Sequence, residues 1–382
     1  MKRVVHFGVG ALGRGLTIPM LVKSGCQVVV VDAYEPLVEK LKETGYYQLY
    51  SVNAPEDQQH QIIRFEKALS LNNDLDEIRQ ILRETDTVTT SVIRENVINV
   101  VRLLAEVWDN EDADKKMVLL CENIENGHDF FQSLLKEVAV DEKQYENLSR
   151  IRVPNTMVDR GCAKNPENIL EVITDEFIEI CVDGRVVPDT GIKYIPAVDN
   201  IDAVFARKRY LVNTKVDAMA FLGLKHQLGS ITEVFGNETI ASELKSYMDL
   251  VRKALVVGYG MTEGEVKYWD NLYDTRFMNS IKSTAKAATS KSTGSARGFD
   301  SVVRNMLRKI SYNERFVLPL IILRKHGEDI SAGISLIADI AAYEKNRQNM
   351  SMEELSETLK EMWCVDEYGQ YLYDEVIRRL NA

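Results

Sequence analysis

The sequence is poor in the residues that build metal sites and disulfide frameworks. Its 382 residues contain five Cys and five His, all widely scattered, with no Cys-x-x-Cys pair. No His stands at a usable spacing from another ligand, which argues against a zinc site, and we expect no metal. An odd set of separated thiols is typical of reduced cysteines, so we expect a cytoplasmic protein.

Excess positive charge and long apolar runs are also lacking. The 47 Lys and Arg residues face 58 Asp and Glu residues, and a net charge of −11 excludes general nucleic-acid binding but not a local anion pocket. The first apolar run, residues 4–22, is broken by four glycines and Arg14, so it predicts neither a signal peptide nor a membrane span. At about 150 residues per domain, the length predicts two or three soluble domains.

The first 32 residues show the pattern of a dinucleotide-binding unit. A β-rich run at 3–7 leads into a glycine loop, then into apolar residues at helical spacing and a second β-rich run. The first glycine permits a tight turn, the second lets the backbone approach a pyrophosphate, and the third lets helix and strand pack closely. The predicted cofactor-binding residues of this loop are Gly8, Val9, Gly10, Ala11, Leu12 and Gly13.

Asp32, at the end of the second β-rich run, indicates which dinucleotide is bound. Its carboxylate can accept hydrogen bonds from the adenosine ribose and would repel a 2′-phosphate. Ala33 supplies no compensating cation, although Lys40 or Lys42 could turn back from the next predicted helix. We therefore expect NAD as the cofactor rather than NADP.

Strands and helices continue to alternate through the first half. Helices at 35–44 and 96–108 and strands at 85–91 and 116–121 predict an α/β, doubly wound sheet of the Rossmann type. Ligands bind outside the carboxyl ends of such strands, so Thr90 is a predicted cofactor-binding residue. The other polar residues at these strand ends are Thr89, Ser91, Glu122 and Asn123, with helix capping as the alternative role.

Long helical patterns replace this alternation after Pro196. The predicted helices cover 201–222, 231–257, 302–309, 316–326, 330–346, 351–362 and 367–380. We expect a Rossmann domain at 1–190 and a predominantly α-helical domain at 191–382. Segment 280–298 carries several cations and few bulky apolar residues, which predicts a mobile loop, either a disordered insertion or a lid over an anionic substrate.

A zinc-independent alcohol dehydrogenase needs another group to accept the hydroxyl proton. None of the 16 Tyr is followed by Lys four positions later, which excludes the short-chain Tyr–Lys pair. A lysine in a desolvated cleft can serve as the base, and an adjacent Asn amide can stabilise the alkoxide. Lys208, Asn213 and position 216 lie at about 0°, 140° and 80° around an ideal α-helix and share one broad face. An ordinary surface lysine is the alternative.

Several stretches in a fixed order resemble one enzyme family. They are HFGVGALGRG at 6–15, DTVTTSV at 86–92, CEN at 121–123, VDR at 158–160, LEV at 170–172, DN with RK-x4-N at 199–213, and R-x3-RKIS at 304–311. Over most of residues 1–325 the sequence resembles the polyol-specific long-chain dehydrogenase/reductase (mannitol dehydrogenase) family, and most closely its mannitol-1-phosphate 5-dehydrogenase branch. The Lys-x4-Asn element is the specific part, because many oxidoreductases share the glycine pattern.

The resemblance implies a metal-free mechanism and assigns residues to it. Lys208 is the implied general base, which deprotonates the substrate alcohol as hydride passes to NAD. Asn213 and Asn123 flank the oxygen and polarise the carbonyl in the reverse direction. The candidate residues for a substrate phosphate are Arg304, Arg308 and Lys309, with solvated helix cations as the alternative.

One position departs from the family pattern. The typical motif is Lys-x4-Asn-x2-His, and the sequence has Val216 where that His normally holds substrate hydroxyls. Lys215 lies seven residues after Lys208 on the same helical face and is the candidate substitute. His226 is roughly 15 Å further along a helix, which is too far. Because of this departure, the sequence indicates the class of reaction more strongly than it indicates the substrate.

The expected function is the NAD-dependent interconversion of a sugar alcohol and its ketose, with mannitol 1-phosphate and fructose 6-phosphate as the default pair. One alternative is a sugar-acid reductase similar to hexuronate reductases of the same family. Another is a dinucleotide-binding protein with degenerate catalysis. The expected partner is the small, phosphorylated substrate, with neither nucleic acid nor membrane.

Overall fold

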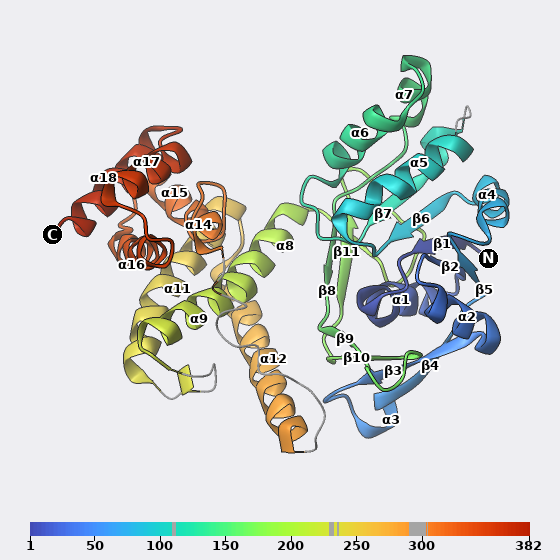
Figure 1. Ribbon diagram of the computed structural model, residues 1–382, viewed down its shortest axis with the longest axis horizontal. Helices are drawn as coiled ribbons and strands as arrows, with labels where there is room; N and C mark the ends of the chain where they lie inside the picture. Colours follow the sequence, from blue (N-terminus) through green and yellow to red (C-terminus); the bar gives the residue numbers. More distant parts are fainter. Residues whose placement is uncertain (109–111, 229–232, 235–236, 290–302, 304) are drawn as a thin grey trace. The chain divides into compact units, whose positions relative to one another are not determined.

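The computed structural model describes residues 1–108, 112–228, 233–234, 237–289, 303 and 305–382. The chain divides into two compact units, Met1–Ile201 and Asp202–Ala382, whereas the sequence placed the boundary after residue 190. The first unit contains the sheets and the second is helical (Figure 1). The predicted fold class, a Rossmann-type α/β region followed by a helical region, is confirmed.

A five-stranded parallel sheet organises the first unit (Figure 1). In spatial order its strands are β5 (Lys67–Ser70), β2 (Gln27–Asp32), β1 (Arg3–Phe7), β6 (Thr87–Thr90) and β7 (Met117–Leu120). The order reverses between β1 and β6, where Phe7 pairs with Val31 on one side and Thr90 on the other. Ligands of open α/β sheets bind at such a switch point.

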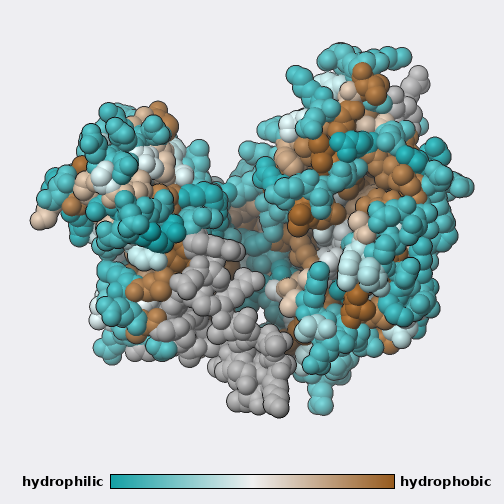
Figure 2. Space-filling view, in the orientation of Figure 1, coloured by the Kyte–Doolittle hydropathy of each residue, from teal (hydrophilic) through white to brown (hydrophobic). Residues whose placement is uncertain are grey.

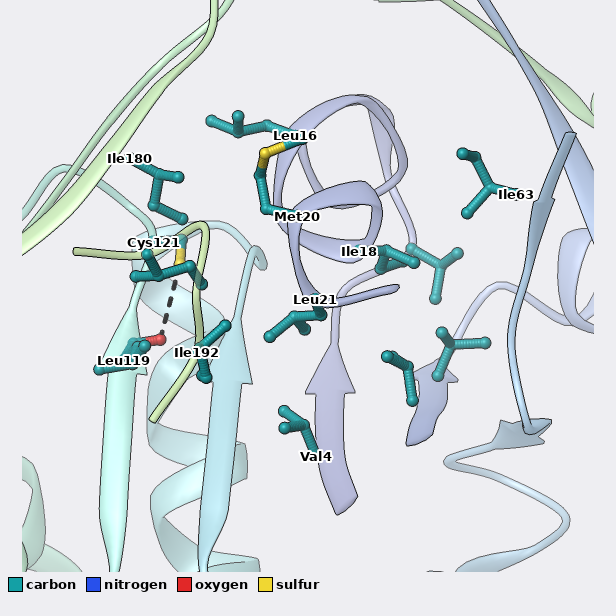
Figure 3. Close-up of a cluster of buried hydrophobic side chains, with 14 of the residues drawn as sticks. Val4, Leu16, Ile18, Met20, Leu21, Ile63, Leu119, Cys121, Ile180 and Ile192 are labelled. Atoms are coloured by element: carbon teal, nitrogen blue, oxygen red, sulfur yellow. Dashed lines mark hydrogen bonds between the residues drawn. The ribbon is translucent and has the colours of Figure 1, made fainter. Parts of the chain in front are cut away.

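Both faces of this sheet are buried, which explains its continuous Val-rich strands. Val4, Val28 and Val30 belong to one core with helices α1 (Ile18–Lys23) and α2 (Glu35–Thr44), and Figure 3 shows part of that core around α1. The alternate strand residues belong to a second core. The helices that contribute to this second core are α4 (Leu75–Arg83), α5 (Val97–Val107), α6 (Gly127–Val138) and α7 (Glu142–Leu148).

Two smaller sheets complete the first unit. The four-stranded sheet contains β4 (His60–Arg64), β3 (Tyr46–Ser51), β10 (Glu171–Thr174) and β9 (Cys162–Lys164), and the three-stranded sheet contains β12 (Ala197–Val198), β11 (Glu179–Asp183) and β8 (Thr156–Asp159). The short helix α3 (Glu56–Gln59) joins β3 to β4. The sequence did not predict these strands, because they are short and the pairing of β3 with β10 joins segments far apart in the chain.

The second unit is built from helices. They are α8 (Ile201–Lys208), η4 (Arg209–Thr214), α9 (Lys215–Lys225), α11 (Glu238–Tyr259), α12 (Glu263–Thr289), α14 (Met306–Lys309), α15 (Leu318–Lys325), α16 (Ser331–Arg347), α17 (Met352–Trp363) and α18 (Glu367–Leu380). Helix α11 packs against α9, α15 and α16, and α18 packs against α16 and α17. These helices match the predicted ones closely, except that α12 was not predicted.

Helix α12 corrects the expectation of a loop at 280–298. The helix continues through Thr289, so the loop prediction is wrong for residues 280–289. The reason is that this stretch is rich in Ala and Lys, which favour helix, and contains neither Gly nor Pro. Residues 290–298 lie outside the described part of the chain.

The visible surface of each unit is mostly hydrophilic, with hydrophobic residues in scattered patches (Figure 2). Its most exposed large apolar side chains, such as Val140, Ile93 and Val365, are far apart in the sequence. No helix among the described residues is both long and apolar enough to cross a membrane. All five cysteines lie in the described part, and none forms a disulfide.

Candidate active site

The glycine loop follows β1 at the switch point, and backbone contact makes two of its glycines obligatory. Gly8 has a φ of +98°, and a Cβ there would lie 2.5 Å from the Ser91 carbonyl carbon. A Cβ on Gly13 would lie 2.1 Å from the Gly8 carbonyl oxygen. A Cβ on Gly10 would meet no atom within 4 Å. Gly10 therefore borders open space, as a glycine that admits a pyrophosphate should.

The helix after this loop begins with a π-helical segment, η1 (Gly13–Thr17). Arg160 donates to the Gly15 carbonyl oxygen at 2.7 Å and to Ser51 Oγ at 2.8 Å. The Tyr47 hydroxyl donates to the carbonyl oxygen of Arg14 at 2.7 Å. These bonds tie the irregular helix start to the four-stranded sheet. Sequence reasoning noted Arg160 only as part of a family stretch and gave it no role.

Asp32 ends β2 beside the glycine loop. Its Oδ2 accepts a hydrogen bond from the Val9 N–H at 2.5 Å, and its Oδ1 accepts one from the Tyr34 N–H at 2.9 Å. A carboxylate offers about four acceptor positions, so these two bonds leave capacity for ribose hydroxyls. The Asp32 carboxylate thus holds the loop in place and can still accept hydrogen bonds from the ribose, as predicted for it.

Thr90 and Glu122 meet at the carboxyl ends of β6 and β7. Thr90 is buried, and its hydroxyl donates to Glu122 Oε2 at 2.8 Å, while the Val92 N–H donates to Oε1 at 2.9 Å. Burial raises the pKa of Glu122 to about 7, against the opposing effect of these hydrogen bonds. The Thr90 hydroxyl is therefore committed to a carboxyl group that titrates near neutral pH.

His6, in β1, is a fully buried titratable group, and sequence reasoning gave it no role. Its Nδ1 lies 2.7 Å from Thr89 Oγ1, and its Nε2 lies 3.0 Å from the Gly8 carbonyl oxygen. Burial lowers the pKa of His6 to about 4, so the ring is neutral at pH 7. The only sequence signal was its place directly before the glycine loop.

Asn123 is exposed immediately beyond β7 and has a φ of +55°. Its Oδ1 accepts a hydrogen bond from the Val158 N–H at 3.1 Å. Because the amide oxygen is used in this way, the amide N–H groups are the part of the side chain left to donate to a ligand. This orientation suits an amide that stabilises negative charge on oxygen.

Lys208 and Asn213 lie at either end of a second π-helical segment, η4 (Arg209–Thr214), and both are half-buried. The ideal α-helix assumed for this stretch is therefore wrong. A π-helix bonds residue i to residue i+5, so two residues five apart occupy successive turns rather than diverging by about 140°. The segment brings the Lys-x4-Asn pair onto one side of the helix. Insertions of this kind occur frequently at functional sites.

Val216 and Lys215 follow this segment. Val216 is half-buried on α9, where the family pattern has His. The Lys215 ammonium lies 3.3 Å from Asp270 Oδ1 and also pairs with Asp274. A substrate hydroxyl would have to share this ammonium with two carboxylates.

The predicted phosphate-binding cations differ in their surroundings. Arg308 pairs with Glu314 at 2.7 Å, and the buried Lys309 pairs with Asp217 at 2.9 Å. Arg304 lies outside the described residues. Among the described residues, no group of three or more His, Cys, Asp and Glu side chains is arranged to hold a metal ion.

Comparison with known proteins identifies the family. A family model of the mannitol dehydrogenase Rossmann domain matches residues 2–194, which is half of the chain. The chain belongs to the mannitol dehydrogenase family. The predicted resemblance is confirmed, and the chain is an oxidoreductase of this family.

Relatives and solved structures agree with membership of the mannitol dehydrogenase family. A mannitol-1-phosphate 5-dehydrogenase of Sclerotinia sclerotiorum is 28% identical over 364 residues, covering 94% of this chain and 89% of that protein. The same enzyme of Alternaria alternata is 24% identical and covers 98% and 96% of the two chains. The fold is similar to that of Pseudomonas fluorescens mannitol 2-dehydrogenase in a ternary complex with NAD and D-mannitol. That likeness has a TM-score of 0.69 at 14% identity, covering 100% and 91% of the two chains.

Proposed function

We propose that this member of the mannitol dehydrogenase family catalyses the NAD-dependent interconversion of mannitol 1-phosphate and fructose 6-phosphate, with Lys208 as the base. The observation that carries the proposal is the Lys208–Asn213 pair on successive turns of one π-helical segment. The names of the similar proteins support the choice of substrate. Val216 in place of the family His makes the substrate the part of the proposal that most needs testing.

The first unit has the features that NAD requires. Gly10 borders open space where a pyrophosphate can approach the backbone, and Asp32 retains acceptor capacity for the ribose. The buried Thr90 donates to Glu122, which also holds the Val92 N–H just beyond β6, so we assign Thr90 an indirect role in cofactor binding. When bound, NAD supplies the hydride acceptor at its nicotinamide ring.

The second unit supplies the proton chemistry. Neutral Lys208 takes the proton of the substrate hydroxyl through its Nζ lone pair, and in the reverse direction the ammonium returns it to the oxygen. The Asn213 amide donates a hydrogen bond to the same oxygen as negative charge develops on it. The amide N–H groups of Asn123, a residue of the first unit, are proposed for the same task. This chemistry needs no metal ligand.

The structure supports a phosphate on the substrate less strongly than it supports the hydroxyl that reacts. Arg308 pairs with Glu314 and Lys309 pairs with Asp217, so a phosphate bound there would share their charge with these two carboxylates. A sugar acid offers a carboxylate in place of the phosphate, and this keeps a hexuronate reductase as the second candidate. The two candidates differ in the anionic group and share the base.

NADH oxidation with a substrate panel tests the proposal. The panel contains fructose 6-phosphate, fructose and a hexuronate, each offered with NADH and with NADPH. We expect the highest kcat/KM for fructose 6-phosphate with NADH. A preference for the hexuronate would replace the substrate and keep the mechanism. No turnover with any member would overturn the enzymatic proposal.

A further inference from the structure

Residue Arg207, directly before the Lys208–Asn213 segment, is held by α12. Its guanidinium carbon lies 3.5 Å from the centre of the Trp269 ring, and its Nε donates to the Tyr273 hydroxyl at 3.2 Å. Arg207 is buried, with 4% of its surface exposed. A buried guanidinium stacked on an indole face and hydrogen-bonded at its edge has little freedom to move.

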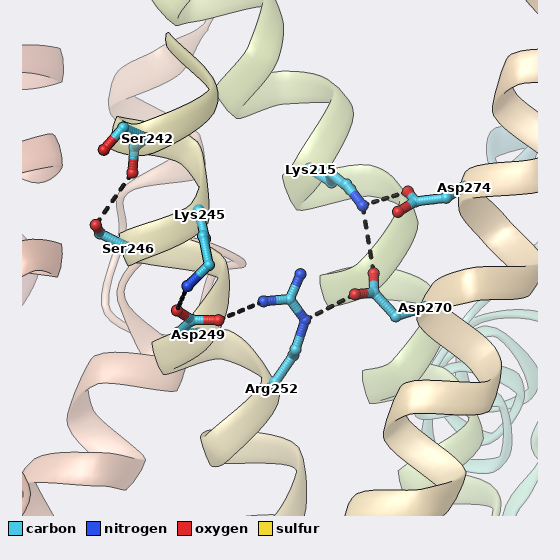
Figure 4. A network of polar contacts seen from close by, with 8 residues as sticks. All are labelled: Lys215, Ser242, Lys245, Ser246, Asp249, Arg252, Asp270 and Asp274. Carbon is cyan, nitrogen blue, oxygen red and sulfur yellow. Dashed lines mark hydrogen bonds and ion pairs between the residues drawn. The ribbon is translucent and has the colours of Figure 1, made fainter. Parts of the chain in front are cut away.

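Residue Lys215, the first residue after η4, is held by the same helix. Its ammonium pairs with Asp270 and Asp274, and Asp270 in turn accepts from Arg252 at 2.7 Å (Figure 4). Arg252 pairs with Asp249 of α11 at 2.7 Å. The network in Figure 4 balances three cations, completed by Lys245, against three carboxylates, so the buried Asp270 carboxylate is fully compensated.

The four α12 residues in these contacts occupy one face of that helix. Trp269 and Tyr273 are four residues apart, as are Asp270 and Asp274, and residues at this spacing are neighbours on a helix surface. This face of α12 therefore contacts Arg207, two residues before η4, and Lys215, the first residue after it. A π-helical insertion is rare and must be stabilised by its surroundings.

We propose that Trp269, Asp270, Tyr273 and Asp274 form a clamp that positions the Lys208–Asn213 pair by holding the chain on both sides of the π-helical segment. These are positioning residues, which act through Arg207 and Lys215. The inference rests on the proposed function for Lys208 and Asn213. In this proposal Lys215 binds Asp270 and Asp274 and has a structural role, whereas the sequence predicted that it contacts the substrate.

The double substitution Trp269→Leu with Asp274→Asn removes one clamp contact on each side of the segment and leaves Lys208, Asn213 and Lys215 in place. The matched control is Asp339→Asn. Lys225, at the other end of α9, also binds two carboxylates, Glu243 at 2.8 Å and Asp339 at 3.0 Å. Both asparagine substitutions therefore remove the more exposed carboxylate of a lysine with two acidic partners.

We expect the double variant to lower kcat about tenfold or more, because a small displacement of reacting groups has large kinetic effects. The KM for NADH should stay within about twofold of wild type, since the clamp is part of the second unit. With NADH deuterated at the transferred position, the isotope effect on kcat should increase, which a smaller folded fraction would not cause. Asp339→Asn should leave all three quantities near wild type.

Two results would overturn the clamp. One is a kcat and isotope effect equal to those of Asp339→Asn. The other is a lower KM for the ketose at unchanged kcat, which is expected if releasing Lys215 frees it to bind substrate.

Amide hydrogen exchange separates this inference from the proposed function, because it needs no turnover. In the double variant, the amides of residues 209–215 should exchange about tenfold faster than in Asp339→Asn, since local opening becomes easier. If wild type turns over no substrate yet exchange accelerates in this segment, the clamp holds the segment and the catalytic proposal fails. Unchanged exchange would overturn the clamp whatever the activity.

Discussion

Each unit contains a π-helical segment next to residues of the proposed site, and the two segments are held in different ways. Gly13–Thr17 is entirely buried and is fixed by close backbone contact and by arginine and tyrosine hydrogen bonds to its carbonyl groups. Arg209–Thr214 is partly exposed and is flanked by side-chain contacts with α12. A segment fixed by close backbone contact cannot accommodate an added methyl group. The contacts that flank the second segment are made by side chains, so substitutions can weaken them one at a time.

The largest expected effect is on the second segment. Lys208→Met should lower kcat about a thousandfold, because the general base is lost while the apolar stem of the side chain is kept. The Kd for NADH, measured by fluorescence titration, should not change. Lys225→Met, which removes a lysine from the far end of α9, is the control and should keep kcat near wild type. Retained turnover in Lys208→Met would exclude this lysine as the base.

Glycine-to-alanine substitutions should distinguish the structural role of the glycine loop from its role in NADH binding. Gly13→Ala should lower the free energy of unfolding by about 3 kcal/mol, because its Cβ meets the Gly8 carbonyl oxygen. Gly10→Ala should leave the unfolding free energy near wild type, since its Cβ meets no protein atom, yet it should weaken NADH binding. Urea unfolding and NADH titration of both variants check this. Equal loss of stability in both would contradict the distinction.

The first unit also contains two titratable groups with opposite pH effects, the half-buried Glu122 and the buried His6. Folding raises the pKa of Glu122 from 4.5 to about 7, so the folded state holds the extra proton and the free energy of unfolding falls as pH rises between these values. Folding lowers the pKa of His6 from 6.5 to about 4, so the unfolded state holds the extra proton and the free energy of unfolding rises with pH in that window. Each change is about 3 kcal/mol at most, and the two oppose one another between pH 4.5 and 6.5.

Single substitutions should reveal this cancellation. Relative to wild type, Glu122→Gln should make the free energy of unfolding rise more steeply from pH 4.5 to 6.5, because the His6 effect is left alone. His6→Gln should give the opposite slope. Urea unfolding at the two pH values measures both. Parallel pH profiles in all three proteins would show that neither group titrates as its burial implies.

The smallest effect concerns cofactor choice. Asp32→Asn keeps an oxygen for the Val9 N–H and removes the charge that faces a 2′-phosphate. The Kd for NADH should rise about tenfold, while the Kd for NADPH stays level or falls. Glu43→Gln removes an exposed acid from α2 and controls for net charge. Parallel weakening of both cofactors would show that Asp32 only supports the loop.

The features that could be predicted are those specified by residues close together in the sequence. The strand, glycine loop and Asp32 were found because each depends on neighbours in sequence. The strands of the two smaller sheets pair residues as distant as Gln48 and Glu171, which no local pattern specifies. The end of α12 at 280–289 was predicted as a loop because its polar composition resembles one, although its residues favour helix.

The sequence by itself determined the dinucleotide-binding loop, the helical second half and the candidate Lys-x4-Asn pair, because glycine geometry, hydrophobic period and residue spacing are properties of short segments. Only the tertiary structure decided that a π-helical segment follows Lys208 and contains Asn213, that Lys215 is bound by two acids of α12, that His6 is buried, and that Glu122 is half-buried. Those facts depend on packing between distant segments. Such packing determines where a helix becomes irregular and which side chains lose contact with water, and no local sequence pattern specifies it.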